Sequence, residues 1–227
     1  MLHINVSQGQ QLQLVTYYQM VIEKNKVMNL TAIEAPDEFL DKHFVDSLSI
    51  NQILDLNEVE RIIDIGTGAG FPGIPLKIVF PHLQVTLLDS LGKRVKFLNE
   101  VIDRLGLENI EAIHGRAEDL AKKEGYRESF DLCVSRAVAN LSTLSEYCLP
   151  FVKVGGCFMA YKSGHIEDEL KASAKAIQIL GGAKAKVSQL TLPETDYDRS
   201  FVQIHKIKET NRKYPRKAGL PSKEPIS

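Results

Sequence analysis

Long apolar runs, clustered cysteines and an excess of either charge are all missing from this chain. No stretch of its 227 residues approaches the roughly 18 uninterrupted apolar residues of a membrane span, and the first ten residues lack a basic start followed by an apolar run. We therefore expect a protein of the cytoplasm with no membrane partner. Its 44% hydrophobic and 25% charged residues are ordinary for a globular protein, which predicts one core that needs no disulfide or metal for support.

Cysteine is scarce, and its placement argues against metal chemistry. Cys133, Cys148 and Cys157 are widely spaced, and each lies in an apolar context. Free cysteine packs like a small hydrophobic residue, so we expect three buried thiols. The chain has no Cys-x-x-Cys pair and no His/Cys cluster, so we expect no structural zinc and no metal in the site.

The net charge of −1 argues against a protein that coats nucleic acid, but the charge is unevenly distributed. Residues 206–227 contain seven basic and two acidic residues, a net of +5. This tail is either a solvated terminus or an arm that contacts phosphate. The basic residues are Lys206, Lys208, Arg212, Lys213, Arg216, Lys217 and Lys223.

From residue 61 onward, short apolar runs alternate with helical patterns, as is typical of βαβ units. This alternation predicts an α/β fold with a seven-stranded, mostly parallel, doubly wound sheet and helices on both faces. The expected strands are Arg61–Ile65, Gln84–Leu88, Ile110–Ile113, Phe130–Ser135, Gly156–Tyr161, Lys184–Thr191 and Phe201–Ile207.

Helical spacing of apolar residues predicts the crossover helices. One runs from Leu91 to Leu105, with Ser90 as its N-cap and Gly106 as its stop, and a second passes through Leu76 and Val79. Two more are expected over Ser142–Leu149 and Ile166–Leu180.

The first 58 residues have a different pattern and predict a helical cap on the sheet. One amphipathic helix is indicated by Leu12, Val15, Val21 and Ile22, and another by Pro36–Ile53. We therefore divide the chain into a cap at 1–58, a core at 59–208 and a basic tail at 209–227.

A glycine-rich loop after the first expected strand is the strongest functional signal. Gly66, Gly68 and Gly70 alternate with other residues and lead through Phe71 to Pro72, which suits a first helical turn. Phe71 stands where the dinucleotide fingerprint G-x-G-x-x-G needs its third glycine, which weakens a nicotinamide interpretation. Asp64 and the three glycines resemble instead the first motif of the Rossmann-like methyltransferases.

The next strand ends supply further polar groups. Asp89 follows Gly70 by 19 residues, at the end of the second strand, where a carboxylate can accept hydrogen bonds from both hydroxyls of a ribose. The third unit continues into Gly115–Asp119, whose backbone amides can read an adenine edge. The alternatives are a structural glycine turn and a solvated strand-end carboxylate.

The fourth strand ends in Ser135–Asn140, where a methyl acceptor would lie. The chain has neither the Asn-Pro-Pro-aromatic motif of amino-group methylation nor a Pro-Cys nucleophile at this edge. Methylation of a ring nitrogen with a free lone pair, such as guanine N7, requires neither of these motifs and no general base.

Together these segments resemble the bacterial ribosomal RNA small-subunit methyltransferase G family, also called glucose-inhibited division protein B. The matching segments are Asp64–Leu76, Gly115–Glu118, Ser135–Ala139 and Lys213–Gly219, with Asn29–Thr31 and His43–Ser47 in the cap. The resemblance implies a class I methyltransferase fold that uses S-adenosylmethionine. It also implies methylation of N7 of one guanosine of 16S ribosomal RNA near the decoding centre, on free RNA or on the small ribosomal subunit. A monomer is the simplest expectation for the oligomeric state.

The resemblance also places a cofactor site. Its family positions are Gly66, Phe71, Ala117, Glu118 and Arg136, to which the residue pattern adds Asp64, Gly68, Gly70 and Asp89. Because the acceptor needs no base, we expect no acid–base catalyst. Arg136 is then a positioning residue, whose planar fork of donors suits a carboxylate, a phosphate or the guanine carbonyl oxygen.

Several polar residues have two interpretations. His43 and Asp46 could form an acid–base pair, but we expect them to make satisfied contacts between the cap and the sheet. Lys93, Arg94, Lys96 and Lys162 either contact RNA phosphate or lie on a solvated face.

Three other functions are compatible with such a fold. They are a methyltransferase of small molecules, an NAD-dependent oxidoreductase, and an RNA-binding protein without catalysis.

Overall fold

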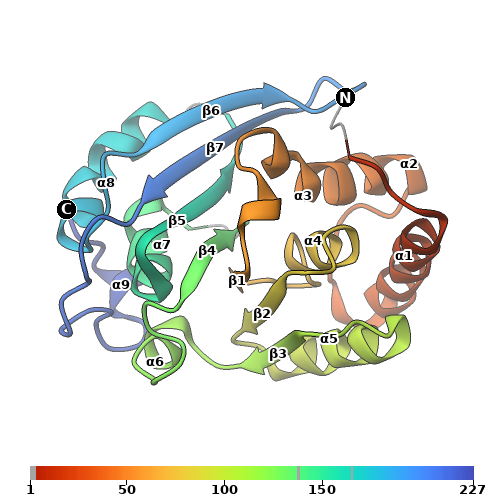
Figure 1. The fold of residues 1–227 in the computed structure, drawn as a ribbon, viewed down its shortest axis with the longest axis horizontal. Helices are drawn as coiled ribbons and strands as arrows, with labels where there is room; N and C mark the ends of the chain where they lie inside the picture. Colours follow the sequence, from red (N-terminus) through yellow and green to blue (C-terminus); the bar gives the residue numbers. More distant parts are fainter. Residues whose placement is uncertain (1–3, 137–138, 165) are drawn as a thin grey trace.

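The computed structural model describes residues 4–136, 139–164 and 166–227. Its centre is one seven-stranded sheet with the strand order β3-β2-β1-β4-β5-β7-β6 (Figure 1). Only β7 is antiparallel to its neighbours β5 and β6. The strands are β1 Arg61–Ile65, β2 Gln84–Asp89, β3 Ile110–His114, β4 Phe130–Ser135, β5 Val152–Lys162, β6 Lys186–Thr191 and β7 Asp198–His205. The predicted fold class is confirmed.

The helices cover both faces of this sheet, and each face encloses its own hydrophobic cluster. The helices α4 Gly73–Val79 and α5 Gly92–Leu105 pack on one face against β1, β2 and β3. On the other face lie α6 Ala117–Leu120, α7 Leu141–Cys148 and α8 Glu167–Ile179, and the short α9 Leu220–Lys223 contacts α7. The expected crossover helices are confirmed, while the four-residue α6 and α9 were not predicted.

The N-terminal residues form the expected helical cap over α4 and α5 (Figure 1). It begins with α1 Gln8–Met28, which a capping box at Ser7 starts. The second expected helix is a continuous helical path that changes its winding. It comprises α2 Pro36–Phe39, a π-helical turn Leu40–Val45, α3 Asp46–Leu48 and a 3-10 turn Ser49–Gln52.

Several details of the prediction were wrong. In α1 the buried apolar residues are Leu14, Tyr17 and Val21. Of the predicted face, Val21 is buried and Ile22 packs against the core, whereas Leu12 and Val15 are exposed. Ser90 is not the N-cap of α5. Leu91 holds that position, and its N–H donates to the Asp89 carboxylate at 2.9 Å.

The boundaries of several strands also differ from the prediction. The observed β5 begins at Val152, because Val152 pairs in parallel with Phe130 of β4, and β7 begins at Asp198, because its antiparallel pairing with β6 starts before the apolar run. Pro72 lies at the N-cap of α4 rather than within its first turn.

The three cysteines are buried free thiols, as predicted. Within residues 4–136, 139–164 and 166–227, no helix has the length and apolar content needed to cross a membrane. The same described residues contain no group of three or more His, Cys, Asp or Glu side chains arranged to hold a metal ion.

Candidate active site

The carboxyl ends of β1, β2, β3 and β4 meet at one edge of the sheet, because these four strands run parallel in adjacent positions. In open parallel sheets, ligands bind at this edge near the point where the strand order reverses, which here lies between β1 and β4. At this edge lie the glycine motif, Asp89 at the end of β2, the Gly115–Asp119 segment and Arg136.

The glycine loop turns sharply between β1 and α4. The N–H groups of Gly66 and Thr67 donate to the Leu88 carbonyl of the neighbouring strand at 2.9 and 3.2 Å. Gly68 has a φ of 64° and Gly70 a φ of 111°, which side chains rarely adopt. A Cβ on Gly70 would come within 2.7 Å of the Tyr17 hydroxyl, so the loop and the cap constrain each other here.

Asp64 stabilises this loop through two hydrogen bonds. Its Oδ2 accepts a hydrogen bond from the Thr67 hydroxyl at 2.6 Å and another from the Gly73 N–H at 2.9 Å. Burial raises the pKa of this carboxyl from 3.8 to about 7, although both hydrogen bonds oppose the shift. The Oδ1 atom is buried without a hydrogen-bond partner among the described residues. The Asp64 side chain therefore shapes the loop, and its contact with cofactor stays a prediction.

Asp89 is the last residue of β2 and also fixes the glycine loop. Its Oδ2 accepts a hydrogen bond from the Gly68 N–H at 3.0 Å and pairs with Arg94 at 3.4 Å. The carboxylate lines the pocket described next. The structure thus places Asp89 at the end of β2 in the wall of a pocket, and its contact with a ribose stays a prediction.

A pocket of about 260 Å³ opens at the carboxyl edge beside this carboxylate. Four residues of the predicted cofactor site line it: Gly66, Asp89, Ala117 and Glu118. Leu144 and Tyr147 of α7 supply the facing wall, which the sequence analysis did not identify. The pocket combines apolar walls with two carboxylates, a combination that suits a nucleoside with hydroxyl and amino donors.

Glu118 lies in α6 at the rim of this pocket and is 3% exposed. Its Oε1 accepts a hydrogen bond from the Gly219 N–H at 2.8 Å. The two residues are 101 positions apart, so no local sequence signal could have found this contact.

Phe71 points away from the pocket and into the cap. Its ring stacks on His43 with centroids 4.5 Å apart and an interplanar angle of 11°, and it also packs against Tyr17. The side chain is buried there, so Phe71 could contact a cofactor only through its backbone. Such a contact stays a prediction.

His43 and Asp46 make the satisfied contacts between cap and sheet that we expected. The Nδ1 atom of His43 accepts a hydrogen bond from Arg136 at 3.1 Å, so Nε2 carries the proton towards the Thr31 hydroxyl at 2.8 Å. Burial and the nearby Arg136 charge lower the pKa of His43 from 6.5 to about 3. A neutral imidazole whose two nitrogens are both hydrogen-bonded in this way does not act as a base at neutral pH.

Arg136 follows β4 and is held by the cap. It donates to the buried Asp46 carboxylate at 2.7 Å, and the guanidinium lies 5.3 Å from the centre of the Phe71 ring. The same carboxylate accepts a second bond, from Arg199 Nε at 2.5 Å. Arg199 was missed by the sequence analysis, because it lies 153 residues from Asp46 on the antiparallel strand β7.

Arg136 lines a second hollow of about 600 Å³. Asn140, Lys162 and Arg199 also line it. Ala139 lines both this hollow and the 260 Å³ pocket around Asp89 and Glu118, which we call the cofactor-side pocket after its predicted ligand. Residues 137 and 138, part of the matching motif after β4, lie outside the described residues. Three cations face two carboxylates here, Asp46 and Glu169, so the hollow has an excess of positive charge.

The remaining basic candidates differ in their surroundings. Lys162 is not solvated: its ammonium donates to the Ala139 carbonyl at 2.6 Å and pairs with Glu169 at 2.7 Å. Lys93 and Lys96 are exposed on α5, and Arg94 pairs with Asp89.

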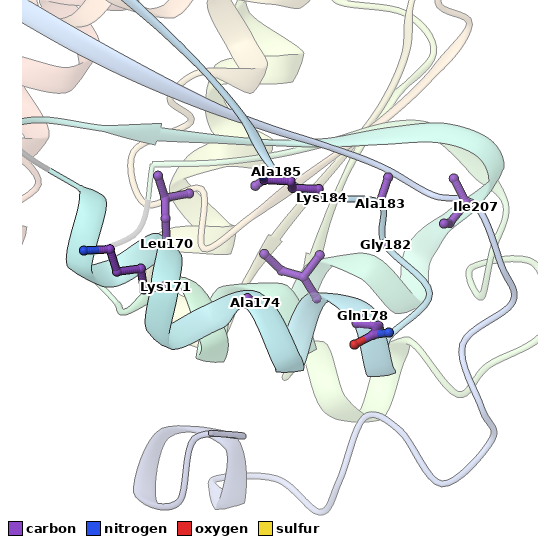
Figure 2. A pocket seen from close by; sticks show the side chains of 10 residues that line it. Leu170, Lys171, Ala174, Gln178, Gly182, Ala183, Lys184, Ala185 and Ile207 are labelled. Atoms are coloured by element: carbon purple, nitrogen blue, oxygen red, sulfur yellow. The ribbon is translucent and has the colours of Figure 1, made fainter.

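An apolar pocket of about 560 Å³ lies between α8 and the segment that leads into β6 (Figure 2). Its lining includes Leu170, Ala174 and Ile207, and none of the predicted site residues. It is separate from the carboxyl edge.

Comparisons with known proteins agree with this geometry. A family model described as rRNA small subunit methyltransferase G matches residues 10–201. The chain is 53% identical over 224 residues to the Ribosomal RNA small subunit methyltransferase G of Alkaliphilus metalliredigens, covering 99% of this chain and 93% of that protein. It is 51% identical over 226 residues to the protein of the same name from Desulforamulus reducens, covering 100% and 94%.

A solved structure shows the same fold at low sequence identity. The SAM-dependent O-methyltransferase from Thermotoga maritima aligns with a TM-score of 0.54 and 18% identity, covering 84% of this chain and 73% of that one.

Proposed function

Since the chain belongs to the rRNA small subunit methyltransferase G family, we propose that it transfers a methyl group from S-adenosylmethionine to N7 of one guanosine in 16S ribosomal RNA, near the decoding centre. The observation that carries this proposal is the pair of adjoining hollows at the carboxyl edge of the sheet. One has the polar and apolar lining for a nucleoside cofactor, and the other has the positive charge for a nucleotide acceptor.

The residues present fit S-adenosylmethionine. Asp89 offers a carboxylate to ribose hydroxyls, Glu118 offers one to an amino group, and Leu144 supplies an apolar wall. Gly66 lines the pocket and a Cβ on Gly68 would meet no atom within 4 Å, so both offer bare backbone to a cofactor, while Gly70 shapes the loop through its contact with the cap. When bound, the cofactor supplies an electrophilic methyl group on a sulfonium. Asp64, Phe71, Ala117 and Arg136 complete the proposed set, as residues that shape or border the site.

Guanine N7 has a lone pair and no proton, so the protein needs to position it rather than deprotonate it. The structure supports such a role, because His43 is neutral and fully engaged and Arg136 is fixed by Asp46. A guanidinium held in this way can present its remaining donors to a phosphate or to the guanine carbonyl oxygen. Its contribution is orientation.

Each of the three segments of the chain has its own role in this proposal. The cap at 1–58 fixes Arg136, the core at 59–208 holds the cofactor, and the tail at 209–227 contacts Glu118 of the pocket. That the enzyme acts in the cytoplasm as a monomer stays a prediction.

The test is to incubate the protein with S-adenosylmethionine carrying a tritiated methyl group, in parallel with unmodified small ribosomal subunits and with naked 16S RNA. We expect label in one guanosine, mapped to N7 after nuclease digestion. Titration with S-adenosylmethionine and with NAD separates the alternatives. Binding of NAD alone would support an oxidoreductase, and cofactor binding without labelled RNA would support a methyltransferase of small molecules.

A further inference from the structure

The C-terminal segment, residues 209–227, is docked onto the molecule rather than solvated. Tyr214 is buried in the hydrophobic cluster of the α7 face. Arg127 fixes the start of the segment by donating to the carbonyls of Thr210 at 2.6 Å and Tyr214 at 3.0 Å. A freely moving phosphate-binding arm would leave these groups exposed to water.

Arg216 is the main anchor of this segment. Its side chain makes a two-pronged ion pair with Glu146 of α7, with Nη2 to Oε2 at 2.7 Å and Nε to Oε1 at 2.9 Å, and its own N–H also donates to Oε1 at 2.7 Å. The Glu146 side chain is 1% exposed. Breaking such a buried pair leaves an uncompensated charge, so the anchor is strong and specific for arginine.

The anchored segment leads directly to the cofactor-side pocket. Beyond Arg216, the Gly219 N–H donates to Glu118, and the Pro221 carbonyl accepts from Thr143 of α7 at 2.9 Å. Glu118 lines the pocket, and the other oxygen of its carboxylate has no hydrogen bond to any side chain or backbone group among the described residues. One oxygen is thus held by the segment while the other remains available to a ligand.

We propose that the C-terminal segment is a positioning element of the cofactor pocket: through Gly219 it fixes the Glu118 carboxylate, and through Arg216 and Glu146 it fixes the α7 wall. The inference rests on the proposed function. Docking of the segment and cofactor binding are then thermodynamically coupled: each must increase the equilibrium constant of the other by the same factor. Docking of the segment strengthens cofactor binding, and cofactor binding holds the segment down.

The first test uses Arg216→Gln in the full-length chain, titrated with S-adenosylhomocysteine by calorimetry. We expect the dissociation constant to rise about 5- to 150-fold, the range typical of coupled sites. The matched control is Arg61→Gln, which removes a partly buried guanidinium bonded to the Ser129 carbonyl at the amino end of β1, the opposite edge of the sheet. We expect the control to lower the melting temperature without changing the dissociation constant.

The second test follows hydrogen exchange of residues 216–222 in the unmodified protein, so it does not depend on whether the variant folds. Saturating S-adenosylhomocysteine should slow exchange in this segment by a factor of the same order as the affinity loss in Arg216→Gln. Equal exchange rates with and without ligand, or an unchanged dissociation constant in a folded Arg216→Gln variant, would overturn the inference. If the unmodified protein binds no S-adenosylhomocysteine at all, the proposed function itself fails.

Discussion

At the scale of single residues, Asp89 has two tasks that a substitution can separate. Its Oδ2 accepts the Gly68 N–H of the glycine loop, and the carboxylate also lines the cofactor-side pocket. An asparagine can retain one acceptor for the loop but loses the charge that strengthens hydrogen bonds to ribose hydroxyls.

We expect Asp89→Ala to weaken S-adenosylhomocysteine binding by about 1–3 kcal/mol, because charge-assisted hydrogen bonds are lost, and Asp89→Asn to weaken it by less. Calorimetric titration of both variants measures the two losses. A variant that loses methyl transfer while keeping full cofactor affinity would place Asp89 in a different role.

His43 makes the stability of the protein depend on pH. Its pKa falls from 6.5 in the unfolded chain to about 3 in the fold, through burial and the charge of Arg136. Between these values the unfolded chain binds a proton that the folded protein does not, so the free energy of unfolding decreases as the pH falls from about 6.5 towards 3.

His43→Gln should remove this dependence, because glutamine can accept from Arg136 and donate to Thr31 without titrating. Between pH 7 and pH 5 we expect the unmodified protein to lose about 2 kcal/mol more stability than the variant does. Urea unfolding at the two pH values measures the difference. Parallel losses in both proteins would show that His43 takes up its proton over the same pH range in the fold as in the unfolded chain.

At the scale of elements, Gly68 and Gly70 lie in the same loop but in different surroundings, so their substitution should affect cofactor binding and stability to different extents. A Cβ on Gly68 meets no atom within 4 Å, whereas a Cβ on Gly70 would lie 2.5 Å from Ile74 and 2.7 Å from Tyr17. Both glycines have positive φ, but only Gly70 is also enclosed by the cap and α4.

We expect Gly68→Ala to cost about 1 kcal/mol of unfolding free energy, from its left-handed conformation, and to lower cofactor affinity. Gly70→Ala should cost about 3 kcal/mol, because overpacking adds to the backbone strain. Chemical denaturation ranks the two variants. Equal losses would mean that Ile74 and Tyr17 move aside without penalty.

The Asp46 carboxylate of the cap is buried and pairs with two arginines of the sheet side, Arg136 at 2.7 Å and Arg199 at 2.5 Å. Asp46→Asn leaves two guanidinium groups with a weaker partner. Because both groups are partly exposed to solvent, we expect a loss near the lower end of the range for buried pairs, about 3 kcal/mol, together with reduced methyl transfer as Arg136 loses its orientation.

The matched control for Asp46→Asn is Glu100→Gln, which removes the exposed partner of Lys24. A pair of this kind contributes about 0.5 kcal/mol or less. Thermal unfolding of both variants measures the contrast, and similar losses in the two would show that the Asp46 junction behaves as a surface ion pair.

The elements that the sequence predicts well are those with their own local pattern. The parallel strands β1, β2 and β4 are covered on both faces, so most of their residues are apolar, and α5 has the period of an amphipathic helix. The four-residue helices α6 and α9 are too short to show any period. The candidate site divides in the same way: the glycine loop and Asp89 follow from local spacing, whereas Arg199 and Gly219 reach it only through long-range packing.

At the scale of the whole molecule, the net charge of −1 gives no general attraction to RNA, so electrostatic attraction has to come from where the charges lie. The docked C-terminal segment changes the interpretation of its basic residues. Arg216 is committed to Glu146, whereas Arg212, Lys217 and Lys223 remain exposed on the surface of the segment.

Truncating the tail would therefore confuse two effects, because it removes the Arg216 anchor along with the exposed charges. The better test is the triple variant Arg212→Gln, Lys217→Gln and Lys223→Gln, which keeps the anchor. If the three side chains contact phosphates, fewer counterions are released on binding, and the slope of log K against log salt concentration should become shallower by about 2.

Filter binding to 16S RNA between low and physiological salt measures this slope, while stability and cofactor affinity should stay unchanged. The control triple Lys26→Gln, Lys171→Gln and Lys175→Gln removes the same charge from exposed positions on α1 and α8. Because counterion release depends on contact and not on total charge, we expect the control to keep the original slope. The same slope in all three proteins would make the exposed face of the segment a solvated surface and leave its role to the anchored contacts alone.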